Sequence, residues 1–488
     1  MPLWSFDNSL ARALGDFCVP WQAATPREPR LVLFNDALAA RLGLPGRVAG
    51  EDALAGWLSG RDPVPGSEPV ALAYAGHQFG HFNPQLGDGR ALLLGEVLAP
   101  DGLRFDLQFK GSGATPFSRS ADGKSTLAAA LREYLISEAM AALRVPSTRS
   151  LAVVATGEGI WRETPHPAAV LTRVAASHLR IGSFEWAAAH KGRDAVAQLA
   201  DYALERHYPE RMHQANRPLA LLDAVAEAQA RLVARWMALG FVHGVMNTDN
   251  VTISGETIDY GPCAFLDGYS DRQVFSSIDH HGRYAFGQQP VVCRWNLYKL
   301  ASALIEAIAE VDQADSEAAR LLLEQWPARY EAHWLREMRA KLGLVEARDG
   351  DLELAQELFT RLEGQQADFT RLFRALAVSL SDGYGALEGE LSDRGVLVEW
   401  HARWYARLAD EGGDPAERAA RMDAENPLYI PRNHLTDAAL TEAEAGDLAP
   451  FLALLDAVTH PFEPREGLDR YTHGAPQGSP RHVTYCGT

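Results

Sequence analysis

The stretch that decides the fold begins Phe241-Val-His-Gly-Val-Met-Asn-Thr-Asp-Asn-Val-Thr-Ile and continues through Ser254-Gly-Glu to Thr257-Ile-Asp-Tyr-Gly. It predicts two short strands that turn at the Ser-Gly pair. The amide oxygen of Asn250 and the carboxylate of Asp259 then lie on two sides of one hairpin, where they can converge on a divalent cation. Hard oxygen ligands, completed by substrate phosphates, are what Mg²⁺ prefers. Taken alone, these side chains are more readily explained by hydrogen bonds to the backbone of a turn.

The spacing within this stretch is that of the protein-kinase catalytic loop. His243 precedes Asn250 by seven residues, as in H-R-D-x-x-x-x-N, and Asp259-Tyr-Gly occupies the place of D-F-G. One position departs from the pattern, because Val245 replaces the aspartate that takes the hydroxyl proton. Asp249 is the nearest carboxylate. The sequence therefore predicts either an inactive kinase relic or a different transfer that uses another base.

The upstream half of the chain strengthens the nucleotide-site interpretation. Residues 91–98 and 103–110 predict two strands joined at Pro-Asp-Gly, and Lys110 ends the second strand. Glu133 follows on a predicted helix, which is the arrangement of a strand lysine that a helix carboxylate holds against phosphate. The run Gly87-Asp-Gly-Arg precedes the hairpin, where glycines let the backbone approach a nucleotide. Together these motifs follow kinase order and predict a kinase-like nucleotide site.

The same pattern predicts an α+β protein with a protein-kinase-like bilobal fold. We expect an N-terminal extension over residues 1–66, a β-rich N-lobe with one main helix over 67–180, and a helical C-lobe over 181–312. A helical C-terminal extension with a cysteine-containing tail completes the chain over 313–488. Hydrophobic periodicity also predicts strands at 150–155 and 168–175 and helices at 125–143, 219–239, 313–342, 351–379, 396–411 and 435–457.

Composition excludes several classes of protein. The chain of 488 residues has 46 Lys+Arg against 64 Asp+Glu, a formal net charge of −18. A general nucleic-acid binder needs a basic surface instead. Four cysteines are too few for a disulfide scaffold. No apolar stretch reaches the ~20 residues that span a bilayer, and the N-terminus has no secretory pattern. We expect a cytoplasmic protein that binds neither membrane nor nucleic acid and is a monomer.

Several longer motifs resemble the selenoprotein O family of protein adenylyltransferases. The resemblance covers nearly the whole chain and rests on Tyr74-Ala-Gly-His-Gln-Phe-Gly, Gln85-Leu-Gly-Asp-Gly-Arg, Gln108-Phe-Lys-Gly-Ser-Gly-Ala-Thr-Pro-Phe-Ser-Arg, Asp122-Gly-Lys, His243-Gly-Val-Met-Asn-Thr-Asp-Asn, Ile258-Asp-Tyr-Gly-Pro-Cys-Ala-Phe-Leu-Asp and Asn426-Pro-Leu-Tyr-Ile-Pro-Arg-Asn. It implies a pseudokinase fold that binds ATP in reversed orientation with Mg²⁺ or Mn²⁺. It also implies transfer of AMP to Ser, Thr or Tyr hydroxyls of protein substrates, redox or metabolic proteins among them, with release of pyrophosphate.

The resemblance assigns a role to each site residue. Nucleotide contacts are implied for Gly87, Gly89, Arg90, Lys110, Asp122, Gly123, Arg173, Arg180 and Asp259, with Glu133 holding Lys110. Asn250 and Asp259 are implied to hold the metal, and Asp249 to accept the proton. Reversed ATP needs positive charge deep in the cleft, because an unpaired anion there is costly. For Arg173 and Arg180, pairing with a carboxylate such as Glu185 is the other explanation.

Two cysteines and two further functions complete the expectations. Cys263 follows Asp-Tyr-Gly, and Cys486 is third from the C-terminus, where the family often has selenocysteine or cysteine. We expect that they can form a disulfide that makes activity redox-dependent, although they are equally explained as unpaired thiols. A phosphoryl-transferring kinase and a non-catalytic nucleotide-binding scaffold remain the alternative functions. For Asp279-His-His, a solvated or hydrogen-bonded role is favoured over a metal site.

Overall fold

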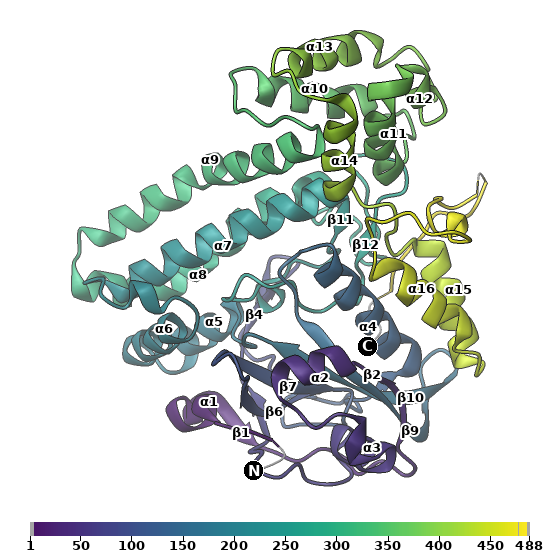
Figure 1. The fold of residues 1–488 in the computed structure, drawn as a ribbon. Coiled ribbons are helices and arrows are strands. Elements are labelled where there is room, and N and C mark those ends of the chain that lie inside the picture. Colours follow the sequence, from purple (N-terminus) through teal and green to yellow (C-terminus); the bar gives the residue numbers. More distant parts are fainter. Residues whose placement is uncertain (1–3, 477, 486–488) are drawn as a thin grey trace.

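The computed structural model describes residues 4–476 and 478–485 of the chain (Figure 1). At its centre is an antiparallel sheet of eight strands in the order β1-β3-β6-β7-β10-β9-β2, with β8 paired to β10. These strands are β1 (Cys18–Pro20), β2 (Arg30–Phe34), β3 (Val70–Leu72), β6 (Ala91–Leu98), β7 (Arg104–Lys110), β8 (Ser125–Thr126), β9 (Arg149–Trp161) and β10 (Pro165–Ala175). Two small hairpin-like pairs lie outside this sheet: β4 (Gly76–Gln78) with β5 (His81–Asn83), and β11 (Phe241–Val242) with β12 (Ala264–Phe265).

Helices cover both faces of the sheet. Successive strand residues point to opposite faces, so neighbours such as Val170 and Leu171 belong to different cores. Val170 packs with α2 (Asp36–Leu42) and α3 (Glu51–Ser59), whereas Leu171 packs with α4 (Leu127–Ala142). The edge strands β1 and β2 come from the first 66 residues, which also include the short α1, so this segment completes the sheet.

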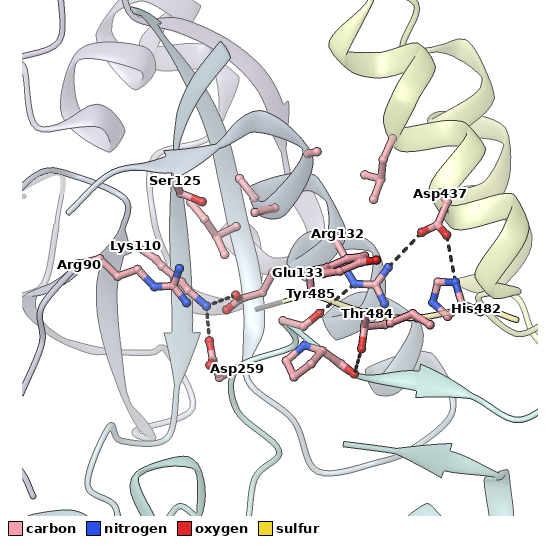
Figure 2. Close-up of a pocket in the computed structure, with 18 residues that line it drawn as sticks. Arg90, Lys110, Ser125, Arg132, Glu133, Asp259, Asp437, His482, Thr484 and Tyr485 are labelled. Atoms are coloured by element: carbon pink, nitrogen blue, oxygen red, sulfur yellow. Dashed lines mark hydrogen bonds and ion pairs between the residues drawn. The ribbon is translucent and has the colours of Figure 1, made fainter. Parts of the chain in front are cut away.

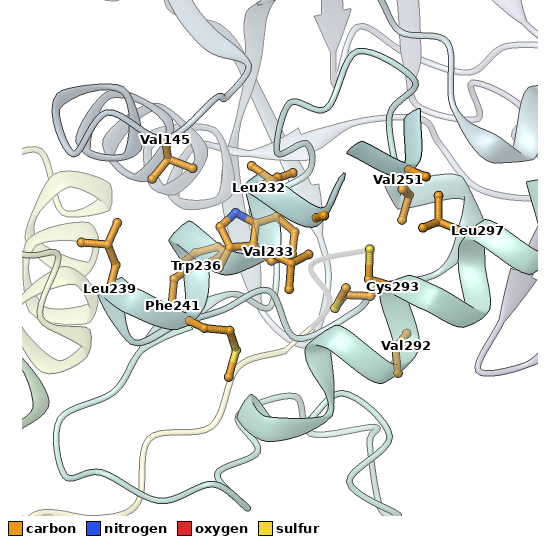
Figure 3. Packing of buried hydrophobic residues seen from close by; sticks show 14 of the residues in the cluster. Val145, Leu232, Val233, Trp236, Leu239, Phe241, Val251, Val292, Cys293 and Leu297 are labelled. Carbon is orange, nitrogen blue, oxygen red and sulfur yellow. The ribbon is translucent and has the colours of Figure 1, made fainter. Parts of the chain in front are cut away.

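A helical layer lies beside the sheet. It contains α5 (Ile181–His190), α6 (Arg193–His207), α7 (Arg217–Leu239), α8 (Gln289–Val311) and α9 (Asp315–Lys341), of which α7, α8 and α9 run side by side (Figure 1). Side chains such as Trp236, Phe241, Cys293 and Leu297 fill the space between α7, α8 and β11 (Figure 3). This packing fixes β11, the strand that leads into the predicted catalytic loop.

The C-terminal third is helical and contacts both layers. Its helices are α10 (Asp351–Leu362), α11 (Phe369–Asp382), α12 (Gly385–Glu388), α13 (Val398–Ala409), α14 (Pro415–Glu425), α15 (Asn433–Glu444) and α16 (Ala449–Val458). In Figure 1, α10 to α14 gather beyond the ends of α7 and α9, whereas α15 and α16 return to the sheet and pack on α4. None of the helices in the described residues has the length and hydropathy needed to cross a bilayer.

The structure confirms the principal predicted elements. The hairpin at 91–110, the helix after it and the long helix ending at Leu239 are present as β6–β7, α4 and α7. α4 begins where the hydroxyl of Thr126 accepts from Ala129 N. α7 ends at Gly240, whose φ of 71° is left-handed. The mixed α/β class with an antiparallel sheet is therefore confirmed.

Three predicted elements were wrong in detail. The predicted helix over 351–379 is two helices, because left-handed Gly364 (φ 82°) follows the first and Asp368 caps the second. The predicted helix over 435–457 is likewise divided at Gly446 (φ 103°) into α15 and α16. The two strands expected around Ser254-Gly are absent from the described residues at 251–259, since Thr252 closes this turn through its own hydroxyl.

Candidate active site

One cavity of about 460 Å³ lies between the sheet and the helical layer. Its walls come from strands β6, β7 and β10, the segment 117–124, and the loop that follows β11. It is lined by every residue that the sequence predicts to contact nucleotide or metal: Gly87, Gly89, Arg90, Lys110, Asp122, Gly123, Arg173, Arg180, Asp249, Asn250 and Asp259. Residues that are far apart in the sequence therefore form one site.

Two buried cations at this site share two carboxylates. Lys110, at the end of β7, donates to Glu133 Oε2 at 2.5 Å and also contacts Asp259 (Figure 2). Arg173 on β10 donates from Nε to Glu133 Oε1 at 2.7 Å and lies 3.4 Å from Asp259 Oδ1. Glu133, on α4, is thus held between the two cations. The predicted pairing of Lys110 with Glu133 is present.

The cations keep these carboxylates ionised. Burial by itself would raise the pKa of Glu133, but the charges of Arg173 and Lys110 leave it lower than usual. The same opposition acts on Asp259, where burial is outweighed by Lys110, Arg90 and Arg173 and the pKa is lowered strongly. Asp259 is therefore an anion throughout the physiological pH range.

Arg180 differs from the paired cations. Its side chain is 5% exposed, and it donates to the carbonyl oxygens of Asp249 (2.9 Å) and His178 (3.2 Å) while its guanidinium lies 4.4 Å from the ring centre of Tyr74. Within the described residues it has no carboxylate within 4 Å. The suggested pairing with Glu185 is not found, since that carboxylate contacts His77 and Thr248. A buried cation without an ion pair is suited to binding an anion.

The glycines of the cavity let two loops approach closely. Gly87 has a φ of 86°, and a Cβ there would meet the ring of Phe117 at 2.4 Å. A Cβ on Gly123 would lie 2.1 Å from Gly113 O. Asp122 beside it accepts two hydrogen bonds from Arg162, at 2.9 and 3.0 Å, which lower its pKa. These contacts hold the segment 117–124 against the loop before β6, the residues that follow β7 and the turn that follows β9.

Hydrogen bonds to backbone carbonyls hold the residues of the predicted catalytic loop in place. His243 donates from Nε2 to Ile258 O at 2.9 Å and so fixes the loop against the segment that carries Asp259. Asn250 ends a short 3₁₀ turn (Thr248–Asn250) and donates from Nδ2 to Val245 O at 3.0 Å. Val245 itself lines the cavity, where its side chain has no atom that could accept a proton.

Asp249 is a buried carboxyl with an unused oxygen. Its Oδ1 is inaccessible to solvent and has no hydrogen-bond partner among the described residues. Burial raises the pKa of Asp249 to about 6, although the charge of Arg180 opposes the shift. The carboxyl of Asp249 packs against Gly76, because a Cβ at that position would lie only 2.4 Å from Oδ1. A carboxyl with a pKa near neutrality and a free oxygen can accept a proton.

The donor set fits a divalent cation. The amide nitrogen of Asn250 is used by Val245 O, which leaves its oxygen for a ligand, and Asp259 is ionised. No cluster of three or more His, Cys, Asp or Glu suited to a metal occurs in the part of the chain that the structure describes. Two protein oxygens are enough for Mg²⁺, which is commonly bound through one or two side chains plus phosphates and water.

Sequence reasoning missed several residues of the site. Tyr74, Gln78, Asp88, Phe117, Lys124 and Asn247 also line the cavity. Asn247 Oδ1 accepts from Phe79 N (3.1 Å) and from the Tyr284 hydroxyl (2.6 Å), so it ties β4–β5 to the catalytic loop. The motif that begins at Tyr74 carries a signal for this hairpin, because its residues from 74 to 80 include two glycines and polar side chains.

The C-terminal tail lies beside the site. A second cavity, of about 340 Å³, shares Lys110 and Asp259 with the first and is closed by α4 and residues 482–485 (Figure 2). The Thr484 hydroxyl donates to Pro262 O at 2.8 Å. Cys263 is a buried free thiol whose pKa burial raises to about 12. Cys486 lies outside the described residues, so the disulfide stays a prediction.

The cavity between the sheet and the helical layer gathers the cations Lys110, Arg173 and Arg180 and the carboxyls of Asp249 and Asp259. The sequence profile described as protein adenylyltransferase SelO matches residues 3–459. A protein nucleotidyltransferase YdiU of Sphingopyxis alaskensis is 53% identical over 485 residues, 99% of this chain and 100% of that protein. Proteins of the same name from Cereibacter sphaeroides and Rhodococcus jostii are 52% and 51% identical, over 99% of this chain and 99% and 94% of theirs. The chain belongs to the SelO family, and it is a nucleotidyltransferase.

Proposed function

We propose that the protein transfers AMP from ATP, bound in reversed orientation, to hydroxyl side chains of proteins. The observation that carries this proposal is the position of Arg180. The chain passes from the sheet to the helical layer between Ala175, the end of β10, and Ile181, the start of α5. A kinase holds adenine at this connection, but a buried guanidinium without an ion pair favours phosphate there. The triphosphate then enters first and the adenosine lies outward.

The reaction balances without an additional reactant. The hydroxyl oxygen of the acceptor attacks the α-phosphorus. The bond from that phosphorus to the oxygen that bridges the α- and β-phosphates breaks, and pyrophosphate leaves. Asp249, whose side chain belongs to the cavity wall, takes the hydroxyl proton, since Val245 cannot. A raised pKa supports this role because a general base works best with a pKa near the operating pH.

The remaining residues bind and orient the nucleotide. Lys110, fixed by Glu133, and Arg173 bind phosphate oxygens, while Gly87, Gly89, Arg90, Asp122 and Gly123 contact the nucleotide at the cavity mouth. Asn250 and Asp259 hold Mg²⁺ or Mn²⁺. The bound cation supplies positive charge that offsets the charge developing on the phosphates.

We also propose a kinase-like bilobal organisation with the boundaries predicted from the sequence. Support comes from the order of the parts: Lys110 on a strand, Glu133 on the helix packed against the sheet, and the loop with Asn250 and Asp259 at the helical layer. The chain would then be a pseudokinase, because Val245 replaces the usual catalytic aspartate. A low cysteine content supports a cytoplasmic location.

Labelled ATP tests the proposed reaction. The full chain is incubated with casein, a generic hydroxyl-bearing acceptor, and ATP labelled at either the α- or the γ-phosphate. We expect only the α-label on protein, with release of pyrophosphate. Asp249→Asn should lower the transfer rate by about 10²–10⁴-fold with ATP binding retained. Asp410→Asn, at an exposed position on the end of α13, is the matched control. Transfer of the γ-label would indicate a kinase, and transfer of neither label a scaffold.

A further inference from the structure

A second groove lies on the other side of the β4–β5 hairpin from the nucleotide cavity. It has a volume of about 880 Å³ and is formed by the turn of this hairpin, the segment 271–285 and the beginning of α8. Phe79, Ile278, Val291 and Trp295 supply apolar surface to it. Ile278 and Val291 are 46% and 61% exposed, which is high for side chains of their kind.

The groove lies next to the candidate active site. Consecutive residues of the hairpin belong to the two spaces, since Gln78 lines the nucleotide cavity and Phe79 lines the groove. Asn247 joins them, because this cavity residue accepts hydrogen bonds from Phe79 N and from the hydroxyl of Tyr284. The ring of Tyr284 in turn lies 5.1 Å from that of Phe79. A chain lying in the groove is therefore next to the loop 247–250, which carries Asp249.

The lining of the groove includes two arginines, Arg272 and Arg283, and two aspartates, Asp271 and Asp279. The guanidinium of Arg283 lies 4.5 Å from the ring centre of Trp295, and the ammonium of Lys299 lies 4.9 Å from the same ring. Arg283 Nε is buried without a hydrogen-bond partner among the described residues. Neither Arg283 nor the exposed Arg272 has a carboxylate within 4 Å in the described part of the chain.

The two aspartates form no ion pair with the guanidinium groups of Arg272 and Arg283 among the described residues. Asp279 accepts from the backbone nitrogens of Arg283 (2.9 Å) and Tyr284 (2.8 Å), so it is occupied in shaping the turn. Burial and the charge of Glu363 raise the pKa of Asp271, which also lines the groove. Two arginines without an ion pair, one of them with a buried and unsatisfied Nε, favour an anionic ligand in this groove.

We propose that this groove binds an extended acidic segment of the acceptor protein and presents its hydroxyl residue to Asp249. The inference rests on the proposed function and adds the substrate class. Carboxylates of the segment pair with Arg272 and Arg283, and an apolar side chain packs between Ile278, Val291 and Trp295. Transfer to proteins then depends on acidic residues near the modified hydroxyl.

Two peptides that differ only in charge test the proposal. Each has one central tyrosine and a fluorescent label, with either glutamates or lysines on both sides. Fluorescence anisotropy measures their binding to the full chain without ATP, and α-labelled ATP measures transfer. We expect the acidic peptide to bind at least about tenfold more tightly, as two or three ion pairs allow. In the transfer assay the difference should appear in KM for the peptide.

Charge reversal separates docking from folding and from catalysis. Arg272→Glu with Arg283→Glu should reverse the preference, so that the lysine peptide binds better. Arg272→Glu alone, at an exposed position, should weaken binding of the acidic peptide by a few-fold. This substitution leaves the packing of Arg283 on Trp295 intact. Arg231→Glu with Arg421→Glu makes the same change in net charge at exposed positions on α7 and α14 and should leave the preference as it is.

The two proposals fail in different ways. Equal binding of both peptides, or a preference that survives charge reversal, would overturn the groove proposal even when the α-label is transferred. Acidic-peptide preference in the anisotropy assay without transfer of the α-label would retain the groove and overturn the proposed reaction.

Discussion

Two sets of buried charges line the same cavity, and they differ in whether opposite charges touch. In the first set, Lys110 and Arg173 share Glu133 and Asp259. In the second, Arg180 contacts carbonyl oxygens, and Asp249 has a free carboxylate oxygen among the described residues. The first set lowers the pKa of Asp259, whereas burial raises that of Asp249. Contact between charges decides the ionisation of each carboxyl.

The difference separates groups that support the fold from groups that await a ligand. A compensated set is held in place before any nucleotide arrives, because each charge has its counterpart within the protein. An uncompensated cation gains most when an anion binds, since its desolvation has already occurred on folding. Loss of a paired residue should therefore affect stability first, and loss of an unpaired one should affect binding first.

Glu133→Gln is expected to have the largest effect on stability. The substitution leaves Lys110 and Arg173 buried with only Asp259 to offset them. We expect the free energy of unfolding to fall by about 3–5 kcal/mol, the range for breaking a buried ion pair. Urea titration followed by circular dichroism measures the loss.

Glu138→Gln on the same helix is the matched control. This carboxylate pairs with Arg149, whose side chain is 27% exposed and can turn to solvent. The fall in the free energy of unfolding should be clearly smaller for Glu138→Gln than for Glu133→Gln. If Glu133→Gln and Glu138→Gln have the same stability, the compensated set does not support the fold in the way its geometry indicates.

Arg180→Met should weaken ATP binding strongly and change the stability of the fold only slightly. The dissociation constant for ATP should rise about 10–100-fold, because a charge-assisted contact to phosphate contributes roughly 1.5–3 kcal/mol. The free energy of unfolding should change by no more than about 1 kcal/mol, since no buried ion pair is broken. Isothermal titration calorimetry and urea titration give the two values. ATP affinity equal to that of the unsubstituted chain would contradict a phosphate beside Arg180.

The paired set was largely predictable from the sequence, because its members occur in motifs with fixed order. The strand ending at Lys110 and the helix carrying Glu133 have strong local patterns, and the spacing from His243 to Asn250 defines the loop. These signals predicted strands β6, β7, β9 and β10, helices α4 and α7, and the residues that line one cavity.

The unpaired set and the groove depend on tertiary contacts that no local pattern contains. Whether Arg180 meets a carboxylate is decided by where Glu185 points, and in the structure that carboxylate turns to His77 and Thr248. The break at Gly364 also escaped prediction, because hydrophobic periodicity continues across it. Long-range packing overrides periodicity at such positions.

Glu256→Gln has the smallest expected effect, and it tests most directly whether burial without a counter-charge keeps a carboxyl protonated. This carboxyl accepts from Ala176 N (2.9 Å) and the Ser254 hydroxyl (3.0 Å), and it has no ion pair among the described residues. Burial raises its pKa to about 7, so the folded protein keeps a proton that the unfolded chain loses at lower pH. The stabilisation is fully present below the unfolded pKa of about 4.5 and is lost as pH rises toward 7.

The stability difference between the unsubstituted chain and Glu256→Gln should therefore shrink as pH rises from 5 to 8, with a slope of at most about 1.4 kcal/mol per pH unit. Glutamine cannot titrate, so subtracting its curve isolates this one carboxyl. Glu205→Gln, at an exposed position on α6, should differ from the unsubstituted chain by the same amount at each pH. A constant difference for Glu256→Gln would mean that this carboxyl is ionised without a partner. Burial without a counter-charge would then not suffice to hold a proton, and the contrast between Asp249 and Asp259 would need another cause.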